Sequence, residues 1–545
     1  MAKTQQVAGT QLTSQPERIP LAGTLMYRSS ARTKDQRFIN CFQESIKNEV
    51  TDSKKVHLVK RPGLTQSTQI LAGGGTARGL IYWDSAYYAV IGDKLYENAV
   101  AKQTLATSSG EVGFMKFDNA GVEYLFLCDG TNAYVINAAG TVTQVNQTYS
   151  AWAAATAKSV GDRVIPTVVN GYYYEVTATS GSAPYTTAPV TQPTWPITIG
   201  TTVVDNELTW TCMGEYGGFP TPHIPTPEFI DGYMLLPAYN SGDIYNSDVD
   251  NIYGWGGGNF VSAEMWPDVI VRLARQNNQL VAFGAQSTEF FYNAANASGS
   301  PFNRNEGTIL QIGCCAPHAI YENERFLLFV GQSESGGRAV WMVEGFSPKK
   351  VSTESVERIL DAAGSAIGTV KGFGLRTKGH LFYVINLAAT TLVYDVEEKV
   401  WHEWSTNVNT AHTTFTYNYQ TDIGSGKSAL LHNTDGYIYL LDPLVYRDNA
   451  TAILADAYTQ KYDGSTMNRK FMHNLNIVGD LGSTYTIRWS DDDYTTWNSY
   501  FTLNTSRPFI TRCGSFRRRA FNIRHTENED FRLEAIEFEV DVGTH

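Results

Sequence analysis

The stretch GHLFYVINLAATTLVYDVEEKVWHEWST, residues 379–406, predicts three short strands joined by two turns. In its first run, LFYVI, both alternating sets of side chains are apolar, which is typical of a strand that is covered on both faces. LVYDV follows, then a polar turn at residues 397–399, after which VWHEW resumes the β-branched and aromatic character of a strand. Carboxylates are expected at such a turn for backbone and solvation reasons. We therefore interpret the stretch as a structural meander and not as a catalytic cleft.

The same unit recurs along the chain in pattern rather than in letters. Further copies begin at residues 78, 123, 270, 320 and 427, and each has a strand, a polar turn and an aromatic-rich strand. About six such units predict a β-propeller. The segment VYDVEEKVWHEW also resembles the end of a kelch-type propeller blade.

Composition narrows the class of protein. The chain has 545 residues, and its 31 Tyr, 11 Trp and 47 Gly favour short strands and tight turns over helices. Forty-two basic and 54 acidic residues give a net charge of -12, opposite in sign to that of a protein that wraps nucleic acid. The six cysteines have no CxxC spacing, so we expect neither a zinc site nor a disulfide framework. We also expect no signal peptide and no membrane span.

The predicted fold class is all-β, with five segments. We expect an N-terminal arm at residues 1–36 that orders against a partner, and a propeller formed by residues 37–147 and 216–455. A small β module is inserted at residues 148–215, and residues 456–545 form a C-terminal β-sandwich-like domain.

Aromatic residues mark the inserted module. Its W…GD.V…NGYYYEV…PTWP…LTW order resembles chitin-binding modules of the five/twelve type. Four rings are candidates for a glycan-stacking surface: Trp152, Tyr173, Trp195 and Trp210. In so small a module, however, large aromatic side chains first of all form the core.

Two motifs lie in the C-terminal domain. SDDDYTTW, residues 490–497, resembles the Asp-box of sialidases, with Tyr494 where glycine is usual; in those families the box is a turn device and not a catalytic site. GSFRRRAFNIRH, residues 514–525, supplies candidate contacts for DNA or for another subunit: Arg517, Arg518, Arg519 and Arg524. Acidic residues follow directly, so cross-strand charge pairs are the simpler interpretation. We expect no catalytic residue, no metal site and no cofactor.

Several separated motifs occur in the order found in one family. RFINCFQE and KRPGL, at residues 37–44 and 60–64, precede a central run at 286–331 and KKVSTESVERIL at 349–360. The central match rests on Glu289, Phe290, Pro301, Phe302, Gln311, Gly313, Ala316 and Pro317. Together with the two C-terminal motifs, this order resembles the tail hub or nozzle proteins of short-tailed bacteriophages (podophages), also called packaged-DNA stabilisation proteins.

The resemblance implies a virion structural protein and not an enzyme. In relatives, the propeller subunit forms a six-membered ring below the portal and adapter, continues the DNA channel, retains packaged DNA and passes it during ejection into the host. The implied partners are further copies of the chain, portal and adapter proteins, tail fibre or spike proteins, and viral double-stranded DNA that is not read for sequence. The implied location is the virion tail, after assembly in the host cytoplasm.

Two alternatives stay open at this point. One is a sialidase-like propeller glycoside hydrolase, which would place an arginine cluster and an acidic pair at the propeller axis. The other is a tail adhesin whose inserted module binds host polysaccharide, which would favour an exposed row of Trp and Tyr.

Overall fold

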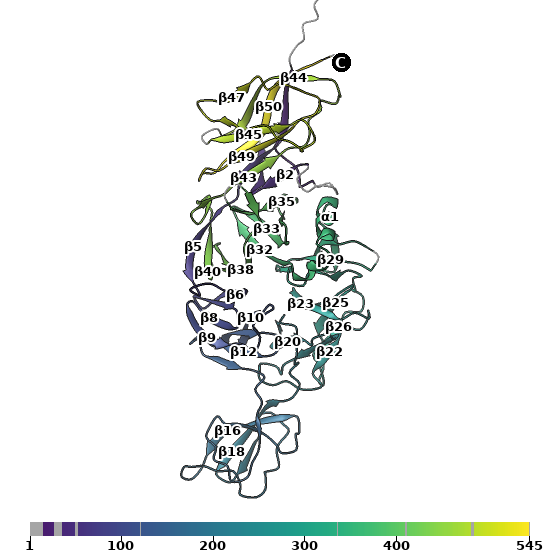
Figure 1. The fold of residues 1–545 in the computed structure, drawn as a ribbon. Helices are drawn as coiled ribbons and strands as arrows, with labels where there is room; N and C mark the ends of the chain where they lie inside the picture. Colours follow the sequence, from purple (N-terminus) through teal and green to yellow (C-terminus); the bar gives the residue numbers. More distant parts are fainter. Residues whose placement is uncertain are drawn as a thin grey trace, which may run out of the picture.

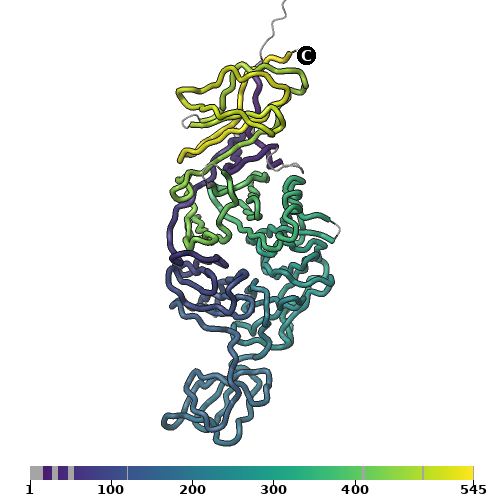
Figure 2. Tube along the Cα trace, viewed as in Figure 1, coloured from purple at the N-terminus to yellow at the C-terminus, as the bar shows by residue number. Residues whose placement is uncertain are grey.

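Three bodies follow one another along the molecule (Figure 1). The computed structural model describes residues 15–26, 35–48, 53–119, 121–334, 336–408, 411–480 and 484–543. A ring of small sheets forms the middle body, the domain that contains the C-terminus lies at one end, and the inserted module lies at the other (Figure 2). The fold is almost entirely β, as the sequence predicts.

The middle body contains seven sheets, which are antiparallel apart from the bridge between β5 and β41, one more than the six units visible in the sequence. The first four are β6–β9 (Ala77–Trp83, Ala86–Ile91, Lys94–Glu97, Val100–Thr104), β10–β13 (Gly113–Asn119, Val122–Cys128, Ala133–Ile136, Val142–Gln144), β19–β22 (Glu228–Ile230, Tyr233–Pro237, Asp243–Asn246, Phe260–Ser262) and β23–β26 (Ile270–Gln276, Gln279–Gly284, Thr288–Asn293, Phe302–Arg304). The fifth is β27–β31 (Gly313–Cys314, Tyr321–Glu322, Leu327–Gln332, Ala339–Glu344, Ser347–Lys350), and the sixth begins with β32–β35 (Lys371–Thr377, His380–Asn386, Thr391–Asp395, Val400–Trp404).

The seventh sheet combines distant parts of the chain. Its strands β38–β40 (Tyr417–Asp422, Ser428–His432, Tyr437–Asp442) are followed in the sheet by β5 (Gly63–Gln69), and then by the short β41 (Arg447–Asp448) and β42 (Thr451–Ala452). β5 pairs antiparallel with β40, from Gly63 opposite Asp442 to Gln69 opposite Tyr437. The inner strand β38 also contacts β6 of the first sheet. The start and the end of the propeller sequence are therefore joined in one sheet.

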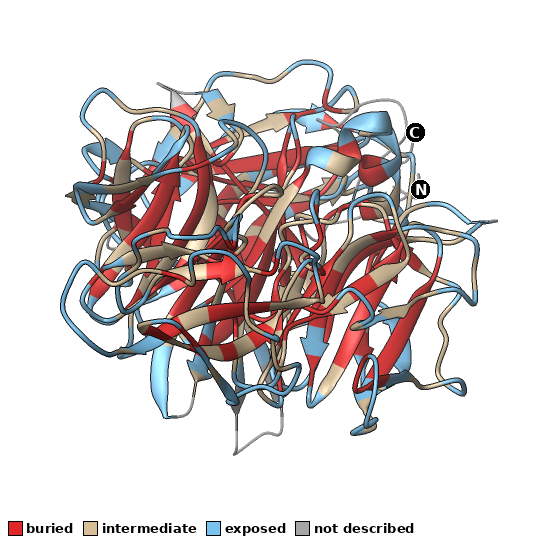
Figure 3. Cartoon of the chain, turned by 90° about the horizontal axis from the view of Figure 1, so that it is seen from below, coloured by how far each residue is buried: buried red, intermediate tan, exposed pale blue. Residues whose placement is uncertain are grey.

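The core of the middle body is divided among the spaces between neighbouring sheets. Buried residues follow the strands, whereas the connecting loops are exposed (Figure 3). In the stretch 379–406, Tyr383 and Ile385 pack with the fifth sheet, while Phe382 and Val384 pack with the seventh. The expectation that this strand is covered on both faces is thus confirmed.

The polar turn in that stretch is also structural. Oδ1 of Asp395 accepts hydrogen bonds from the backbone N–H groups of Glu397 and Glu398, at 3.0 and 3.2 Å. Its Oδ2 lies 2.7 Å from Nδ1 of His380. Asp395 is fully buried, so its lone pairs are used within the sheet.

A short helical segment covers the outside of the fifth and sixth sheets. α1 (Glu354–Ala362) is followed by the 3-10 helix η1 (Gly364–Thr369), and Oγ1 of Thr353 caps α1 by accepting from the N–H of Val356. Its apolar face buries Val356, Ile359 and Leu360. A separate hairpin, β36 (Thr406–Val408) and β37 (Ala411–Thr413), leads to the seventh sheet.

The inserted module is a five-stranded sheet with its own core. Its strand order is β14-β15-β16-β18-β17, with bounds Ser150–Ala151, Arg163–Ile165, Tyr172–Thr179, Leu208–Glu215 and Thr202–Asp205. Val164, Tyr174, Trp210 and Cys212 are among the fully buried residues of the core. The six cysteines of the chain are free thiols.

The C-terminal domain is built from both ends of the chain. One sheet contains β1 (Gln15–Pro20), β3 (Cys41–Asn48), β4 (Ser53–Lys60), β44 (Lys470–Gly479), β47 (Phe509–Thr511), β48 (Ser515–Phe516) and β50 (Arg532–Val542). The other continues the sixth propeller sheet through β2 (Arg37–Ile39) into β43 (Ala455–Tyr458), β49 (Ala520–His525), β45 (Tyr485–Ser490) and β46 (Phe501–Leu503). Buried side chains of both sheets form one core, as in a sandwich.

The N-terminal boundary differs from the sequence expectation. The expected arm ends at residue 36, but β1 pairs along β50 and residues 37–60 also belong to the C-terminal domain, so the propeller starts at β5. Apart from the β3–β4 hairpin, the strand partners of this segment lie far downstream, as in Ile39 with Glu403 and Gln15 with Val540, and no local pattern reveals them. Residues 1–14 and 27–34 of the expected arm lie outside the described residues.

We predict that Leu21→Ala destabilises the C-terminal domain by about 2–5 kcal/mol, because the change leaves a cavity in a packed core. Leu21 is fully buried among core residues from β44 and β50. Urea denaturation followed by tryptophan fluorescence measures the loss, with the exposed Arg18→Ala as the control, expected within about 0.5 kcal/mol of the parent. A Leu21 variant as stable as that control would show that the segment adds nothing to the core.

We also predict that the protein loses stability as the pH falls from 6.5 to 4. Burial lowers the pKa of His402, on β35, from 6.5 to about 4, so only the unfolded state binds a proton in this window. That difference corresponds to about 3 kcal/mol. His402→Phe keeps an aromatic ring and removes this proton uptake, so it should lessen the shift of the urea midpoint between pH 7 and pH 4.5. Equal shifts in both proteins would contradict the prediction.

Candidate functional site

The inner strands of all seven sheets surround one cavity of about 560 Å³. Its lining comes from β6, β10, β19, β23, β28, β32 and β38 and from the loops beside them. Each of these strands contacts the next one around the middle body. This axial cavity is the place where residues far apart in the sequence converge.

Glu111 is the centre of one charged group at the axial cavity. Glu111 forms ion pairs with both His318 and Lys371. Burial alone would raise the pKa of Glu111, but these two partners outweigh it and hold the pKa below its usual value. Burial lowers the pKa of Lys371 despite its carboxylate partner. The result is a closed set of charges with opposite signs.

A second group of charges lies on β19, β23 and β28. Nη1 of Arg272 donates to the carbonyl of Pro317 at 2.8 Å, and Nη2 lies 4.0 Å from Glu322. Burial raises the pKa of both Glu228 and Glu322, and the charge of Glu322 raises that of Glu228 further. Within the described ranges, no three or more His, Cys, Asp or Glu side chains are placed to hold a metal ion. The lining of the axial cavity thus carries charges of both signs: the carboxylates of Glu111, Glu228, Glu322 and Asp422, and the cations of Lys116 and Arg272.

The arginines named from the sequence are not at this axis. Arg517, Arg518, Arg519 and Arg524 all belong to the C-terminal domain, at or next to β48 and β49, whereas Arg272 is the arginine that lines the axial cavity. The Asp-box also lies in that domain, where Oδ1 of Asp492 accepts from the N–H of Thr496 at 2.8 Å. The arrangement that a sialidase-like mechanism requires at the axis is therefore not formed by these motifs.

The four C-terminal arginines fall into two classes. Arg519 is buried and forks onto Asp491, with N–O distances of 2.7 and 2.8 Å. Arg524 forks onto Asp456, at 3.0 and 2.8 Å. Arg517 and Arg518 are exposed. Two of the candidates therefore form ion pairs inside the domain, and only the other two face solvent.

A chain of polar contacts that the sequence does not predict lies at the joint between propeller and C-terminal domain. Oγ of Ser405 lies 2.7 Å from Nδ1 of His412, whose Nε2 lies 2.7 Å from Oδ2 of Asp456. The Ser405 hydroxyl also accepts from Nδ2 of Asn40 at 2.8 Å, and Ser405 and Asp456 are buried. A nucleophilic hydroxyl needs a face that is open to substrate. The contacts instead tie β2, β35 and β43 together.

The aromatic rings proposed for glycan stacking lie inside the module. Trp152, Tyr173 and Trp210 are buried, and Oδ2 of Asp205 accepts from Nε1 of Trp152 at 2.7 Å and from that of Trp210 at 3.1 Å. Trp195 is half-buried and packs against the core. The rings form no exposed row, and Trp210 belongs to the core of the small module. Glycan binding through them stays a prediction.

The two classes of arginine predict different mutational costs. Arg524→Ala should lower the free energy of unfolding by about 3–5 kcal/mol, because it leaves the buried Asp456 carboxylate without its forked partner. The exposed Arg517→Ala should change it by no more than about 0.5 kcal/mol. Urea titration of both variants tests this difference, and equal costs would argue against it.

The chain matches one family by sequence and several solved structures by shape. The family model described as "Phage_stabilise: Bacteriophage P22 Gp10, beta-propeller" matches residues 223–445. No curated protein matches the chain. In the described residues, no helix is long and apolar enough to cross a bilayer.

The solved structures are distant in sequence. They include BBS1N in complex with ARL6DN (10% identity, TM-score 0.34, 70% of this chain and 98% of that chain). Dihydro-heme d1 dehydrogenase NirN is 10% identical, with a TM-score of 0.30 over 91% of this chain and 82% of its own. YCF48 from Cyanidioschyzon merolae is 9% identical, with a TM-score of 0.26 over 61% and 99%. At these TM-scores, the structures add nothing to the functional argument.

The match to the family model covers the third to the sixth propeller sheets and strands β38–β40 of the seventh, and it includes the central run and the KKVSTESVERIL motif. Residues 223–445 are thus similar to the phage stabilisation proteins, the family that the sequence motifs indicate.

Proposed function

We propose that this protein is a subunit of the tail nozzle of a short-tailed phage. Six copies form a ring below the portal and adapter, continue the DNA channel, retain the packaged genome and pass it during ejection. The observation that carries the proposal is the match of residues 223–445 to the phage stabilisation family. Tail fibres or spikes are further partners in this arrangement, and the protein acts in the virion tail after assembly in the host cytoplasm.

The size of the axial cavity favours a channel between subunits. A volume of about 560 Å³ holds some twenty water molecules at ~30 Å³ each. Duplex DNA has a major groove that alone is about 12 Å wide and 8.5 Å deep, so a duplex does not fit through the axis of one propeller. In the proposed ring, DNA therefore passes along surfaces that several copies supply.

The charge of the chain supports transit without tight binding. A net charge of -12 repels phosphate in general, and nucleic acid binding depends on neutralising phosphates with Lys and Arg. Arg519 and Arg524 are occupied by carboxylates of their own domain. Contacts to DNA in the proposed channel are thus sparse and independent of sequence.

The proposal gives the protein a structural and not an enzymatic role. Several charged groups at the axial cavity are paired, as in Glu111 with His318 and Lys371. Such pairs connect sheets across the axial cavity, since Glu111 precedes β10 of the second sheet, His318 precedes β28 of the fifth and Lys371 begins β32 of the sixth. No separate catalytic group is needed to explain their presence.

We expect the full-length protein to form a six-membered ring, of about 362 kDa for six chains of 60.3 kDa, in the presence of the portal and adapter of its virion. Mass photometry gives the stoichiometry, and cryo-electron microscopy shows whether the ring is coaxial with the portal. The portal and adapter without this protein serve as the control. A protein that stays monomeric and unattached under these conditions would overturn the nozzle assignment.

A further inference from the structure

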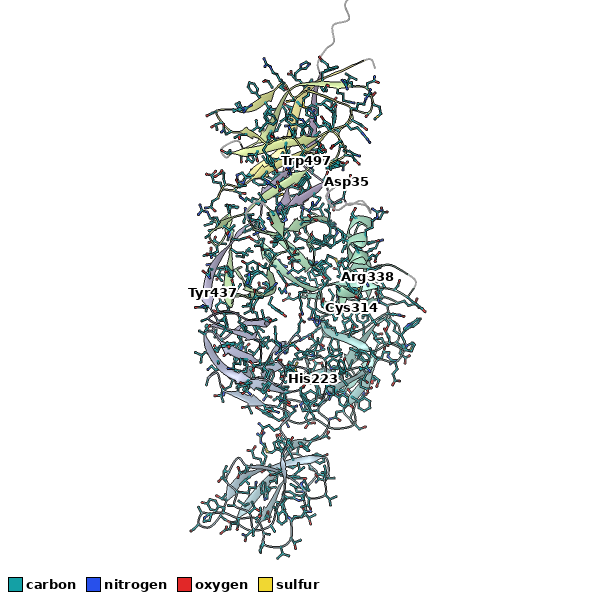
Figure 4. The ribbon with its side chains drawn as sticks, viewed as in Figure 1. Asp35, His223, Cys314, Arg338, Tyr437 and Trp497 are labelled. Atoms are coloured by element: carbon teal, nitrogen blue, oxygen red, sulfur yellow. The ribbon has the colours of Figure 1, made fainter. Side chains whose placement is uncertain are left out.

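A second cavity lies where the inserted module joins the propeller. Its volume is about 350 Å³. The propeller supplies Asn132, Gln144 and Tyr253 to the lining, and the two connecting segments supply Gln147 and Tyr216. His223, which marks the end of the returning segment, lies in the propeller on the side that faces the module (Figure 4). We call this space the junction cavity.

The walls of the junction cavity are held in place by hydrogen bonds between the two bodies. The N–H of Glu215, the last residue of β18, donates to Oδ2 of Asp248 at 3.1 Å, and its carbonyl accepts from the N–H of Trp255 at 2.9 Å. Nδ2 of Asn251 donates to the carbonyl of Met213 at 3.0 Å. The cavity is therefore preformed, which reduces the ordering that a ligand must impose.

A cation–π contact adds to this connection. The guanidinium of Arg163, in the module, lies 5.2 Å from the ring centre of Tyr253, in the propeller. Nε of Arg163 also donates to Glu175 at 2.7 Å, so its charge is satisfied within the module. Arg163 thus supports the wall and leaves no free positive charge for an anionic ligand.

The lining combines aromatic faces with amide and hydroxyl groups. Tyr216, Phe219 and Tyr253 are half-buried, so parts of their rings face the cavity. Nε2 of Gln147 donates to the carbonyl of Gln144, but its Oε1 has no hydrogen-bond partner among the described residues. The hydroxyl of Tyr216 likewise has none within the described part of the chain.

One carboxylate completes the lining. Oε2 of Glu215 accepts from Nδ2 of Asn259 at 2.9 Å, which leaves Oε1 for a ligand. Burial raises the pKa of Glu215, and the nearby Asp248 raises it further. A second negative charge in the cavity would meet this carboxylate without a compensating cation.

These features select a class of ligand. Ligand pockets usually have volumes of about 300–1,000 Å³, lie preferentially between domains, and combine aromatic walls with a few polar groups. A pyranose ring presents C–H faces that suit the tyrosine and phenylalanine rings, and hydroxyl groups that must each find a partner when they leave water. Gln147, Glu215 and Tyr216 provide such partners. We propose that the junction cavity binds a neutral saccharide unit.

The site differs from the stacking surface that the sequence suggested, since none of Trp152, Tyr173, Trp195 and Trp210 lines the junction cavity. It also does not depend on the proposed ring, because all of its lining residues come from one chain. A monomer should bind the saccharide as well as an assembled ring does.

The test is saturation-transfer NMR on the full-length protein with D-glucose, D-galactose, D-mannose, L-rhamnose and N-acetyl-D-glucosamine as probes, and D-glucuronate as the charged comparison. We expect saturation transfer to at least one neutral sugar, and binding at least tenfold weaker for glucuronate. Tyr216→Ala should abolish transfer because it removes both a ring face and a hydroxyl. Gln147→Ala, which removes a half-buried amide from the lining, should weaken binding at least fivefold.

Tyr292→Ala is the matched control, because Tyr292 is a partly exposed ring on β25 and does not line the junction cavity. It should bind like the parent, and circular dichroism verifies that all variants are folded. The inference is overturned if no neutral sugar receives saturation, if glucuronate binds as tightly, or if neither Tyr216→Ala nor Gln147→Ala changes the binding. Ring formation is measured in a separate experiment. A failure of saccharide binding therefore does not affect the test of the nozzle proposal, and a failure of ring formation does not affect the test of saccharide binding.

Discussion

The pairing of β5 with β40 is the contact that joins the two ends of the propeller and leads the chain to the C-terminal domain. It places residues 63–69 beside residues 437–442, and so makes one sheet from the two ends of the propeller sequence. Without β5, β40 would present an unpaired strand edge, which is a site of wrong pairing and aggregation. The same pairing brings the preceding segment back toward the C-terminal domain, where β1 to β4 find their partners.

Buried polar groups fix the position at which this pairing begins. Arg61 lies two residues before β5, is almost fully buried, and forks onto Asp448 of β41. Its guanidinium also lies 5.4 Å from the ring centre of Phe415 and donates to the carbonyl of Ser405 at 3.0 Å. A buried ion pair is stabilising only with such complete hydrogen bonding. Because these partners occupy set positions, a slipped register of β5 would leave a buried charge unpaired.

The accuracy of the sequence-based predictions follows the range of the interactions. The first strand in residues 379–406 could be predicted because the apolar residues of both its faces follow one another directly in the sequence. The sheet β19–β22 was not predicted from the sequence, because its strands are short and residues 247–259, between β21 and β22, form a long irregular loop. The place of β1 in the C-terminal sheet depends on partners more than 500 residues away, and the local sequence pattern does not indicate these partners.

Tyr494 of the Asp-box is a further case in which the local sequence pattern does not predict the structure. Tyr494 has a φ of 65°, a left-handed conformation that explains why glycine is usual there. A tyrosine is accommodated because its hydroxyl donates to the carbonyl of Thr459 at 2.8 Å and its ring is buried. The axial charges and the junction cavity are harder still to foresee, because each gathers residues from several sheets. Lys371 and Glu111, for example, are 260 positions apart.

The place of insertion gives the module a mechanical connection to the propeller. It enters after β13 and returns before β19, so two chain segments run side by side through the junction, and the hydrogen bonds of Glu215, Asp248 and Asn251 hold them. A ligand in the junction cavity would touch both bodies and would favour the relative orientation in which those contacts are complete. The residues that determine this orientation are few and lie around one cavity, whereas the module core and the propeller core are separate. Saccharide binding at the junction would therefore stabilise the direction in which the module projects, without any change within either core.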